Sequence, residues 1–508
     1  MTDKRYCLTI DQGTTGTKCL IIDHEGNKVA WKYSEHQQIY PRPGWVEHDP
    51  IEIIEKTCNV MNAALKEARI RSDEIAAIGV TNQRETTMLW NPKTGRPYYN
   101  AIVWQCTRTK DICDSLREHD DFIQKRTGLF SSTYFSGPKI KWILDNVPGI
   151  REKVEKEMVY FGNIDSWLIW WLTGGPKKGA HVTDYTNGSR TMLMNIKKLV
   201  WDKEMLGLLG IPESILPALR PSSDKEIYGY TQVDGILGAA IPVCGDLGDQ
   251  QAALVGQACF REGEVKNTYG TGCFILSTTG EEPRFSKNRL LTTVAFSLER
   301  NRCCYALEGS IAIAGSAIQW LRDNLKLIKS SSETEKIAES ISEEGSGGIY
   351  FVPAFSGLYA PFWDSNARGV ICGLTRFVKR EHLVHATLES ICWQTRDVFE
   401  AMVNDSNMRL EALKVDGGAS VNNYLMQLQA SILGCNVVRP KFTETTSLGA
   451  AYAAGVAVGF WKDLNELRKL WAVDRIFEPK WSKEKSDHLY KGWKESVKLT
   501  MGWLKKIA

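Results

Sequence analysis

Short apolar runs that end in glycine-rich polar turns recur along the chain. One run, Tyr6–Ile10, leads through a Gly/Thr turn into a second run that ends at Asp23. The segment Val265–Leu276 repeats this order of apolar run, Gly/Thr turn and apolar run. Because two strands joined by a short turn that contains glycine form a β-hairpin, each segment predicts one hairpin.

Two more strands are predicted, and each of them ends in a polar turn. They cover Ile75–Thr81 and Leu413–Gly418. One helix is predicted from about Glu381 and another after Gly418, stopping at Gly434, because a periodic set of side chains recurs there at helical spacing. The periodic positions are Leu383, Thr387, Ile391, Val398 and Met402 in the first helix and Leu425, Leu428 and Ile432 in the second.

The second half of the chain repeats the pattern of the first half. Each half opens with a hairpin, and each contains a strand that runs into a polar turn, with helical segments in between. This order predicts two related α/β domains, residues 1–255 and residues 256–508. The stretch Ser330–Gly348, rich in Ser, Glu and Gly, is expected to form a surface helix and a loop.

Composition and charge limit the kinds of partner and the cellular compartment that can be expected. A net charge of +3 over 508 residues gives no reason to expect nucleic acid as a partner. No apolar run reaches the roughly 18 residues of a membrane span, so no membrane insertion is expected. The first residues lack the apolar core of a signal peptide, and none of the 13 cysteines falls in a Cys-x-x-Cys pair. A cytoplasmic protein with reduced thiols is therefore expected.

A phosphate-binding turn is predicted in the first hairpin. The chain contains no Gly-x4-Gly-Lys-Ser/Thr loop, but residues 11–18 read Asp-Gln-Gly-Thr-Thr-Gly-Thr-Lys. Gly13 and Gly16 let backbone N–H groups approach an anion, Lys18 adds a charge, and Asp11 can hold a hydrated Mg²⁺. Further donors are the hydroxyls of Thr14, Thr15 and Thr17. The alternative is a polar hairpin turn without a ligand.

A second polar turn carries two carboxylates. The apolar strand Ala239–Val243 is expected to run into a Gly/Asp turn, after which a helix begins at the pair Gln250-Gln251. Carboxylates at such a turn can bind Mg²⁺, act as a base or cap the helix. Asp246 is interpreted as a cap or turn residue, and Asp249 is the candidate base.

An arginine and a glutamate stand side by side in a third polar turn, at Arg84 and Glu85. A guanidinium group offers a fork of donors and a carboxylate offers acceptors, which together suit two neighbouring hydroxyl groups. The alternatives are a surface ion pair for these two residues and a core position for Trp104, which follows in an apolar strand. The double glycine that ends at Gly418 allows a flat ring or a phosphate to approach the backbone.

The order and company of these motifs resemble the FGGY carbohydrate-kinase family, from Arg5 to about Trp503. The most specific stretches are Pro43–Pro50, Gly79–Thr87, Tyr134–Gly137, Gly248–Ala253, Asn267–Phe274 and Pro353–Leu358. Both family signatures are similar to segments of this chain, at residues 134–146 and 369–389.

The resemblance implies a role for each matching position. The implied ligands of the polyol hydroxyls are Arg84, Glu85, Tyr134 and Asp249, with Gln250 beside them. The implied apolar walls are Trp104 and Phe274, and the implied carboxylates near Mg²⁺ are Asp11 and Asp249. The implied phosphate and nucleotide residues are Thr14, Thr15, Lys18, Gly270, Thr271, Gly315, Gln319, Gly418 and Asn422.

The resemblance also implies a fold and an activity. The fold is two related α/β domains of the actin-like ATPase (ribonuclease H-like) type with a cleft between them. The activity is transfer of the γ-phosphate of Mg·ATP to a small polyol, with glycerol as the expected acceptor, and the expected assembly is a homodimer or a higher homo-oligomer. Two alternatives stay open: a kinase for a pentulose or erythritol, and a non-catalytic actin-like ATPase module without a polyol pocket.

Overall fold

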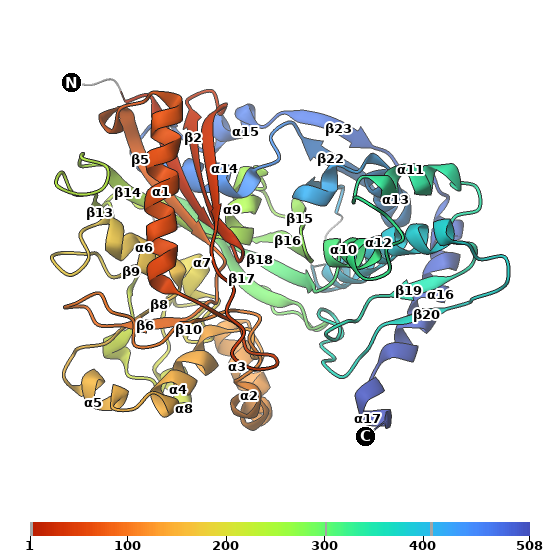
Figure 1. Cartoon of the computed structure of the whole chain (residues 1–508), viewed down its shortest axis with the longest axis horizontal. Coiled ribbons are helices and arrows are strands. Elements are labelled where there is room, and N and C mark those ends of the chain that lie inside the picture. Colours follow the sequence, from red (N-terminus) through yellow and green to blue (C-terminus); the bar gives the residue numbers. More distant parts are fainter. Residues whose placement is uncertain (1–3, 300–301, 407–409, 508) are drawn as a thin grey trace.

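The structure, a computed structural model, describes residues 4–299, 302–406 and 410–507. Two β-sheets, each covered by helices, lie side by side and form the two α/β units that were predicted (Figure 1). Both predicted hairpins are confirmed, and so are the predicted strands in β5 and β21. Helices α12 (Arg380–Ser406) and α13 (Asn423–Leu433) confirm the helical spacing, and Gly434 ends α13 in a left-handed conformation. The division at residue 255 stays a prediction.

The first sheet has the strand order β13-β14-β5-β1-β2-β3. Its strands are β1 (Tyr6–Gln12), β2 (Gly16–Asp23), β3 (Lys28–Glu35), β5 (Ile75–Asn82), β13 (Gly229–Tyr230) and β14 (Pro242–Gly248). Strands β1, β5 and β14 run parallel, and their last residues lie in register, Gln12 beside Asn82 and Asn82 beside Gly248. The three chain segments that follow these strands therefore meet at one edge of the sheet.

The second sheet has the order β17-β18-β16-β15-β21-β22-β23. Its strands are β15 (Val265–Tyr269), β16 (Cys273–Gly280), β17 (Leu291–Glu299), β18 (Arg302–Ile311), β21 (Ala412–Asp416), β22 (Asn436–Pro440) and β23 (Val473–Phe477). Strands β15 and β21 are parallel, with Thr268 beside Asp416. The turns after them, which contain Gly270 and Gly418, consequently lie at the same edge.

Two helices rich in small residues form a layer between the sheets, α9 (Asp249–Gly256) and α14 (Thr445–Ala457). Figure 1 shows α14, in blue, beside the red strands of the first sheet, although it comes from the far end of the chain. A Cβ atom at Gly449 would lie 1.8 Å from the Ala252 carbonyl oxygen, so only glycine allows the two helices to approach this closely. Helix α1 (Pro50–Ala68) covers the opposite face of the first sheet.

The turn predicted for the Gly/Asp segment, residues 244–248, is wrong. This segment is the second half of strand β14, and α9 begins at Asp249 instead of at the glutamine pair. Asp246 is neither a cap nor a turn residue: it lies buried in the strand, where its carboxyl accepts hydrogen bonds from the Asp184 N–H at 3.1 Å and from Asn187 Nδ2 at 3.4 Å. Glycine disfavours strands, but a Cβ atom at Gly245 would lie 2.5 Å from the Ala454 nitrogen, so tertiary packing overrides propensity.

The remaining elements surround these two sheets. The short strands are β4 (Glu47–His48), β6 (Met88–Trp90), β7 (Ala101–Ile102), β8 (Tyr160–Gly162), β9 (Val182–Asp184), β10 (Met194–Asn195), β11 (Val200–Trp201), β12 (Ala218–Arg220), β19 (Tyr350–Val352) and β20 (Val370–Cys372). The further helices are α2 (Lys110–Leu116), α3 (Asp120–Thr127), α4 (Ser136–Asn146), α5 (Ile150–Glu155), α6 (Ile164–Leu172), α7 (Tyr185–Gly188), α8 (Lys203–Leu209), α10 (Gly315–Asp323), α11 (Glu333–Ser340), α15 (Leu464–Leu470), α16 (Lys483–Thr500) and α17 (Trp503–Ile507). Helix α11 and the turns after it confirm the surface helix and loop predicted for Ser330–Gly348.

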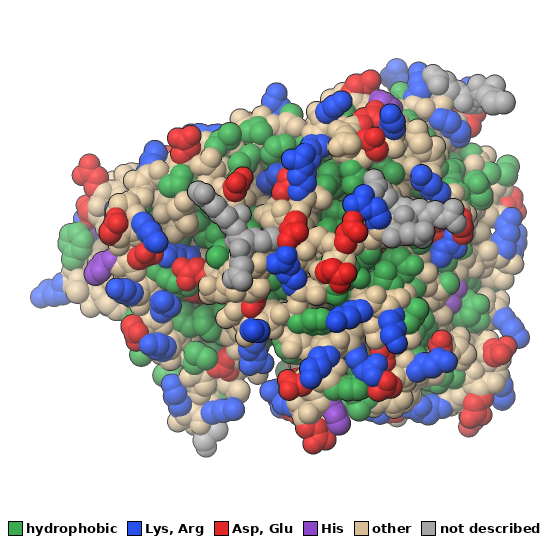
Figure 2. Space-filling model, turned by 180° about the vertical axis from the view of Figure 1, so that it is seen from behind, with side chains coloured by type: hydrophobic (Ala, Val, Ile, Leu, Met, Phe, Trp, Pro, Cys, Tyr) green, Lys and Arg blue, Asp and Glu red, His purple; other side chains and the backbone are tan. Residues whose placement is uncertain are grey.

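The surface carries charges of both signs. On the face shown in Figure 2, Lys and Arg side chains are interspersed with Asp and Glu side chains, in keeping with the small net charge of +3. In the part of the chain that the structure describes, none of the helices combines the length and the apolar character that a membrane crossing needs.

Candidate active site

The candidate base lies where the first sheet meets α9. Asp249 is the first residue of the helix, and its Oδ1 atom accepts hydrogen bonds from the Gln250 N–H at 2.7 Å and forms an ion pair with Arg84 Nε at 3.0 Å. Burial raises the pKa of Asp249, and Asp11 adds to this, although Arg84 and Lys266 oppose it. The Asp249 side chain keeps 28% of its surface exposed, so this carboxylate is accessible to a ligand.

Arg84 and Glu85 are buried, with exposed fractions of 2% and 1%, which rules out the surface ion pair considered above. The Arg84 guanidinium donates to the Tyr134 hydroxyl at 3.3 Å, and its backbone has a φ of 47°, an unfavourable conformation for a residue other than glycine. Such outliers gather at functional sites. Lys139 supports the neighbouring loops, since its Nζ donates to the carbonyl oxygens of Phe135 at 3.2 Å and Glu85 at 3.4 Å.

Aromatic rings line the site beside these polar groups. Trp104 packs edge-to-face against Tyr134 and Phe274, with ring centroids 5.5 and 6.3 Å away. Trp104 is not a plain core residue, because its Nε1 donates a hydrogen bond to the Thr14 hydroxyl at 2.9 Å and so joins the ring to the first Gly/Thr turn. Trp104 and Tyr134 also line a cavity of about 210 Å³, to which the loop containing Tyr359 and Trp363 contributes from the second half of the chain.

The first Gly/Thr turn connects β1 and β2 and is closed by a hydrogen bond from the Gly13 N–H to the Gly16 carbonyl oxygen at 2.9 Å. Asp11 and Lys18 face each other across the two strands. Helix α14 and the residue before it hold both: the Ser447 hydroxyl donates to Asp11 at 3.0 Å, and Glu444, at the N-cap, forms an ion pair with Lys18. Although burial disfavours its charge, the carboxylates of Asp11 and Glu444 raise the pKa of Lys18 and keep it protonated.

The second Gly/Thr turn, between β15 and β16, is closed in the same way, with the Gly270 N–H donating to the Gly272 carbonyl oxygen at 2.9 Å. Helix α10 begins against this turn. The Gly315 N–H donates to the Gly270 carbonyl oxygen at 3.0 Å, and the Ser316 N–H donates to the Thr271 carbonyl oxygen at 3.1 Å. The structure therefore brings the second turn and the start of α10 together, while Gln319 lies exposed further along α10.

The glycine pair and Asn422 lie after strand β21. Gly418 is exposed, and a Cβ atom there would meet no protein atom within 4 Å. The Asn422 side chain caps α13, because its Oδ1 accepts from the Leu425 N–H at 2.9 Å while its Nδ2 donates to the Thr334 hydroxyl at 3.2 Å. Both ends of this amide are engaged within the protein, and its contact with a nucleotide stays a prediction.

Gly315 and Gly418 give a test of the nucleotide site that the sequence predicts. Gly315→Ala is expected to lower the melting temperature and to raise the KM for ATP, because its Cβ atom would lie 2.5 Å from the Gly270 carbonyl oxygen. Such overpacking costs about 1–3 kcal/mol. Gly418→Ala is the matched control for stability, since its Cβ atom is unobstructed. Thermal melting and initial rates at saturating polyol check this, and equal melting temperatures for the two variants would contradict the packing described here.

Three charged residues that were not predicted complete the site. Lys266, in β15, is buried and donates from Nζ to Gln250 Oε1 at 2.6 Å, and burial lowers its pKa to about 8. Glu308 in β18 and Arg190 after α7 are also buried and contact the Arg84–Glu85 pair. A glutamate within the mainly apolar stretch of β18 was an available signal for Glu308. Lys266 stands beside Asn267 and Thr268 in its strand and Arg190 follows an ordinary polar turn, so neither gave a clear signal.

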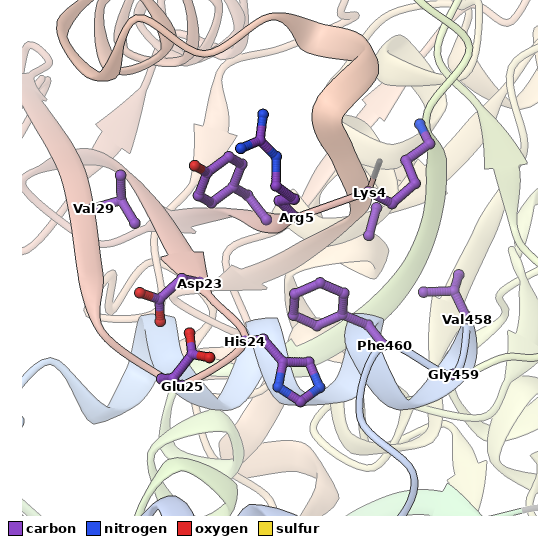
Figure 3. Close-up of a pocket in the computed structure, with 11 residues that line it drawn as sticks. Lys4, Arg5, Asp23, His24, Glu25, Val29, Val458, Gly459 and Phe460 are labelled. Atoms are coloured by element: carbon purple, nitrogen blue, oxygen red, sulfur yellow. The ribbon is translucent and has the colours of Figure 1, made fainter. Parts of the chain in front are cut away.

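A separate cavity of about 740 Å³ lies elsewhere, at the start of β1 and the end of α14. Figure 3 shows the ring of His24 next to Phe460, and the ring centroids are 5.1 Å apart. Its two basic residues are engaged with the protein, since Lys4 donates to the Ile75 carbonyl oxygen at 3.0 Å and Arg5 pairs with Glu74. None of the predicted site residues lines this cavity. The candidate active site is therefore the one described above, at the edges of the two sheets.

Comparisons with known proteins agree with this arrangement. Residues 6–256 match the N-terminal domain model, and residues 265–458 the C-terminal domain model, of the FGGY family of carbohydrate kinases. Glycerol kinase 2 of Thermotoga maritima is 57% identical over 504 residues, which are 99% of this chain and 100% of that protein. A glycerol kinase of Chloroflexus aurantiacus is 57% identical over 502 residues, 98% of this chain and 99% of that protein.

Solved structures show the same fold. The crystal structure of Plasmodium falciparum glycerol kinase with ADP matches with a TM-score of 0.90 and 40% identity, and the match covers 98% of each chain. A ligand-bound xylulose kinase from Lactobacillus acidophilus matches with a TM-score of 0.84 and 22% identity, over 97% of this chain and 96% of that chain. The second likeness concerns the fold alone. On the two matching domain models and the full-length relatives, this chain belongs to the FGGY family of carbohydrate kinases.

Proposed function

We propose that this protein phosphorylates glycerol, transferring the γ-phosphate of ATP to a terminal hydroxyl to give sn-glycerol 3-phosphate and ADP. The observation that carries the proposal is the meeting of a donor fork, acceptors and a candidate base at one sheet edge, beside two Gly/Thr turns suited to phosphates. The three relatives named above that are 40% or more identical, from Thermotoga maritima, Chloroflexus aurantiacus and Plasmodium falciparum, are glycerol kinases and support glycerol as the acceptor.

Some of the polar side chains bind the glycerol hydroxyls, and another accepts a proton. Arg84 donates to the glycerol hydroxyls and Glu85 accepts from them, with Tyr134 beside both, while Trp104 and Phe274 contact the carbon chain. Asp249 accepts the proton of the attacking hydroxyl. Because phosphoryl transfer passes through a largely dissociative transition state, deprotonation is late and a weak base such as a carboxylate suffices.

The phosphate side of the site uses charges and backbone amides. Lys18 and the backbone N–H groups of Thr14, Thr15 and Thr271 orient the phosphates of ATP and spread their charge, and Gly270 lets the phosphates approach the second turn closely. Asp11 and Asp249 would hold Mg²⁺, which takes one or two carboxylates plus waters and neutralises phosphate charge. The two carboxylates fit this cation, because Asp11 lies beside Thr81 near the end of β1 and Asp249 follows Gly248, which lies beside Asn82, so both stand at the same edge of the first sheet.

A substrate comparison tests the proposal. ADP release is measured by a coupled assay with glycerol, erythritol and xylulose at equal concentrations, and without any polyol. Glycerol is expected to give the highest kcat/KM. Preference for xylulose or erythritol would favour another FGGY kinase activity, and turnover that ignores every polyol would favour an ATPase module.

Trp104→Ala is expected to weaken selectivity for glycerol over four-carbon polyols, because a smaller wall leaves room for a longer chain. One methylene-sized contact is worth about 1–3 kcal/mol, so a modest change is expected in the ratio of the two kcat/KM values. The ratio for glycerol and erythritol is measured in the wild type and in the variant. An unchanged ratio would place the wall elsewhere.

Two finer properties are part of the proposal. The cytoplasm suits a chain whose described cysteines are all free thiols, because reducing compartments keep thiols in this state. A homodimer or higher homo-oligomer stays a prediction, which light scattering on the purified protein tests.

A further inference from the structure

A glutamate from the second half of the chain holds the main polyol-binding arginine. Glu308 lies in β18, in the second sheet, and is completely buried. Its two carboxylate oxygens accept from both terminal nitrogens of Arg84, with Oε2 2.6 Å from Nη1 and Oε1 3.2 Å from Nη2. A paired contact of this kind fixes the plane of a guanidinium group as well as its position.

Arg190 extends this contact to Glu85. Its Nε donates to Glu85 Oε1 at 2.7 Å, and its Nη2 contacts Glu308 Oε1 at 3.2 Å. All four side chains are buried, and they comprise two positive and two negative groups. Arg190 Nη1 is buried without a hydrogen-bond partner among the described residues, which leaves a donor in this network for a ligand or a water.

The remaining donors of Arg84 are also directed by this arrangement. With its outer edge on Glu308, Arg84 presents Nε to Asp249 at 3.0 Å and Nη2 to the Tyr134 hydroxyl at 3.3 Å. Without the Glu308 charge, two guanidinium groups would remain close together in a buried site, with fewer anions to compensate them. Arg84 would then turn toward Glu85 and Asp249, the acceptors that glycerol and its proton need.

We propose that Glu308, supported by Arg190, is a positioning residue that holds Arg84 and Glu85 in the geometry that recognises the polyol. This inference rests on the proposed function. On this proposal, the second half of the chain contributes to polyol affinity in addition to binding ATP. It does so through Glu308, a side chain that does not touch the polyol.

A double-mutant cycle tests the inference, with Glu308→Gln, Arg84→Lys and the double variant. Glu308→Gln keeps the size of the side chain and removes its charge. The variant loses hydrogen bonds between charged groups, which contribute strongly to the free energy of a buried site. The glycerol KM is therefore expected to rise about 10- to 100-fold, while the ATP KM changes less than about twofold. Because Glu308 acts through Arg84, the double variant is expected to be little worse than Arg84→Lys alone.

Controls separate this effect from a general loss of structure. Glu264→Gln removes another arginine-paired glutamate, whose partner Arg468 is not a site residue, and is expected to leave the glycerol KM unchanged. Glu308→Asp keeps the charge with a shorter reach and is expected to give an intermediate KM, which provides a measurement if Glu308→Gln does not fold. An unchanged glycerol KM, or strictly additive effects in the cycle, would overturn the inference. A wild-type protein without glycerol-dependent ADP release would overturn the proposed function instead.

Discussion

Asp249→Asn is expected to lower kcat by about 10²–10⁴-fold while ATP still binds, because a positioned base contributes about that much. The substitution keeps the shape of the side chain and one acceptor oxygen, and it removes the basic carboxylate. Burial raises the pKa of this carboxyl, which suits it to take up a proton, while Arg84 and Lys266 oppose the rise and favour the charged form that a base needs. The measurement is kcat per folded, ATP-binding molecule, with thermal melting alongside.

A structural role for Asp249 predicts a different result. If it only starts α9, the variant would lose stability and keep nearly normal turnover in its folded fraction. Asp397→Asn is the matched control, because Asp397 is a buried aspartate bonded to Tyr490 and Trp493, away from the site. This control is expected to melt at a different temperature and to keep its kcat. A kcat of Asp249→Asn within a few-fold of the wild type would show that Asp249 is not the base.

Arg84→Lys is expected to lower kcat/KM for glycerol by roughly 30-fold or more, since replacing one partner of a buried, hydrogen-bonded charge pair costs about 2–5 kcal/mol. Lysine keeps the charge but loses the fork that contacts Glu308, Asp249 and Tyr134 together. Most of the loss is expected in the glycerol KM, because the contacts with the hydroxyls exist before the transition state.

The two Michaelis constants decide where Arg84 acts. Initial rates are measured over a grid of glycerol and ATP concentrations for the wild type and for Arg84→Lys. The ATP KM is expected to change little. A rise in the ATP KM alone would move Arg84 from the polyol pocket to the nucleotide site.

Local patterns were enough to predict the parts of the fold that are specified by neighbouring residues. The Gly/Thr hairpins, the strands that precede Arg84 and Gly418, and helix α13 with its stop at Gly434 are all of this kind. The signal in each case is a run or periodic set of apolar residues that ends at a glycine or at a polar turn. The second half of strand β14 was misassigned because Gly245 packs against Ala454 of α14, some 200 residues later in the sequence, and Gly248 packs against Arg84. No local pattern reports such contacts.

The same distinction applies to the candidate site. Arg84 and Glu85 stand in a distinctive polar turn, and Asp249 stands in a polar Gly-Asp-Gln-Gln stretch at the start of α9, so the sequence predicted that they carry chemistry. The roles of Glu308 and Arg190 follow only from contacts between residues far apart in the sequence. Glu308 is 224 positions from Arg84 and 118 positions from Arg190. Ion pairs of this kind depend on how the two sheets are placed, and the placement follows from the small-residue layer of α9 and α14.

The most direct test of the account is to identify the product. Purified protein is incubated with ATP, Mg²⁺ and glycerol, and the phosphorylated product and ADP are quantified together, with a parallel reaction that lacks glycerol. The account predicts sn-glycerol 3-phosphate and ADP in equal amounts, and little ADP when glycerol is left out. Equal ADP release with and without glycerol, or the absence of glycerol phosphate, would contradict it.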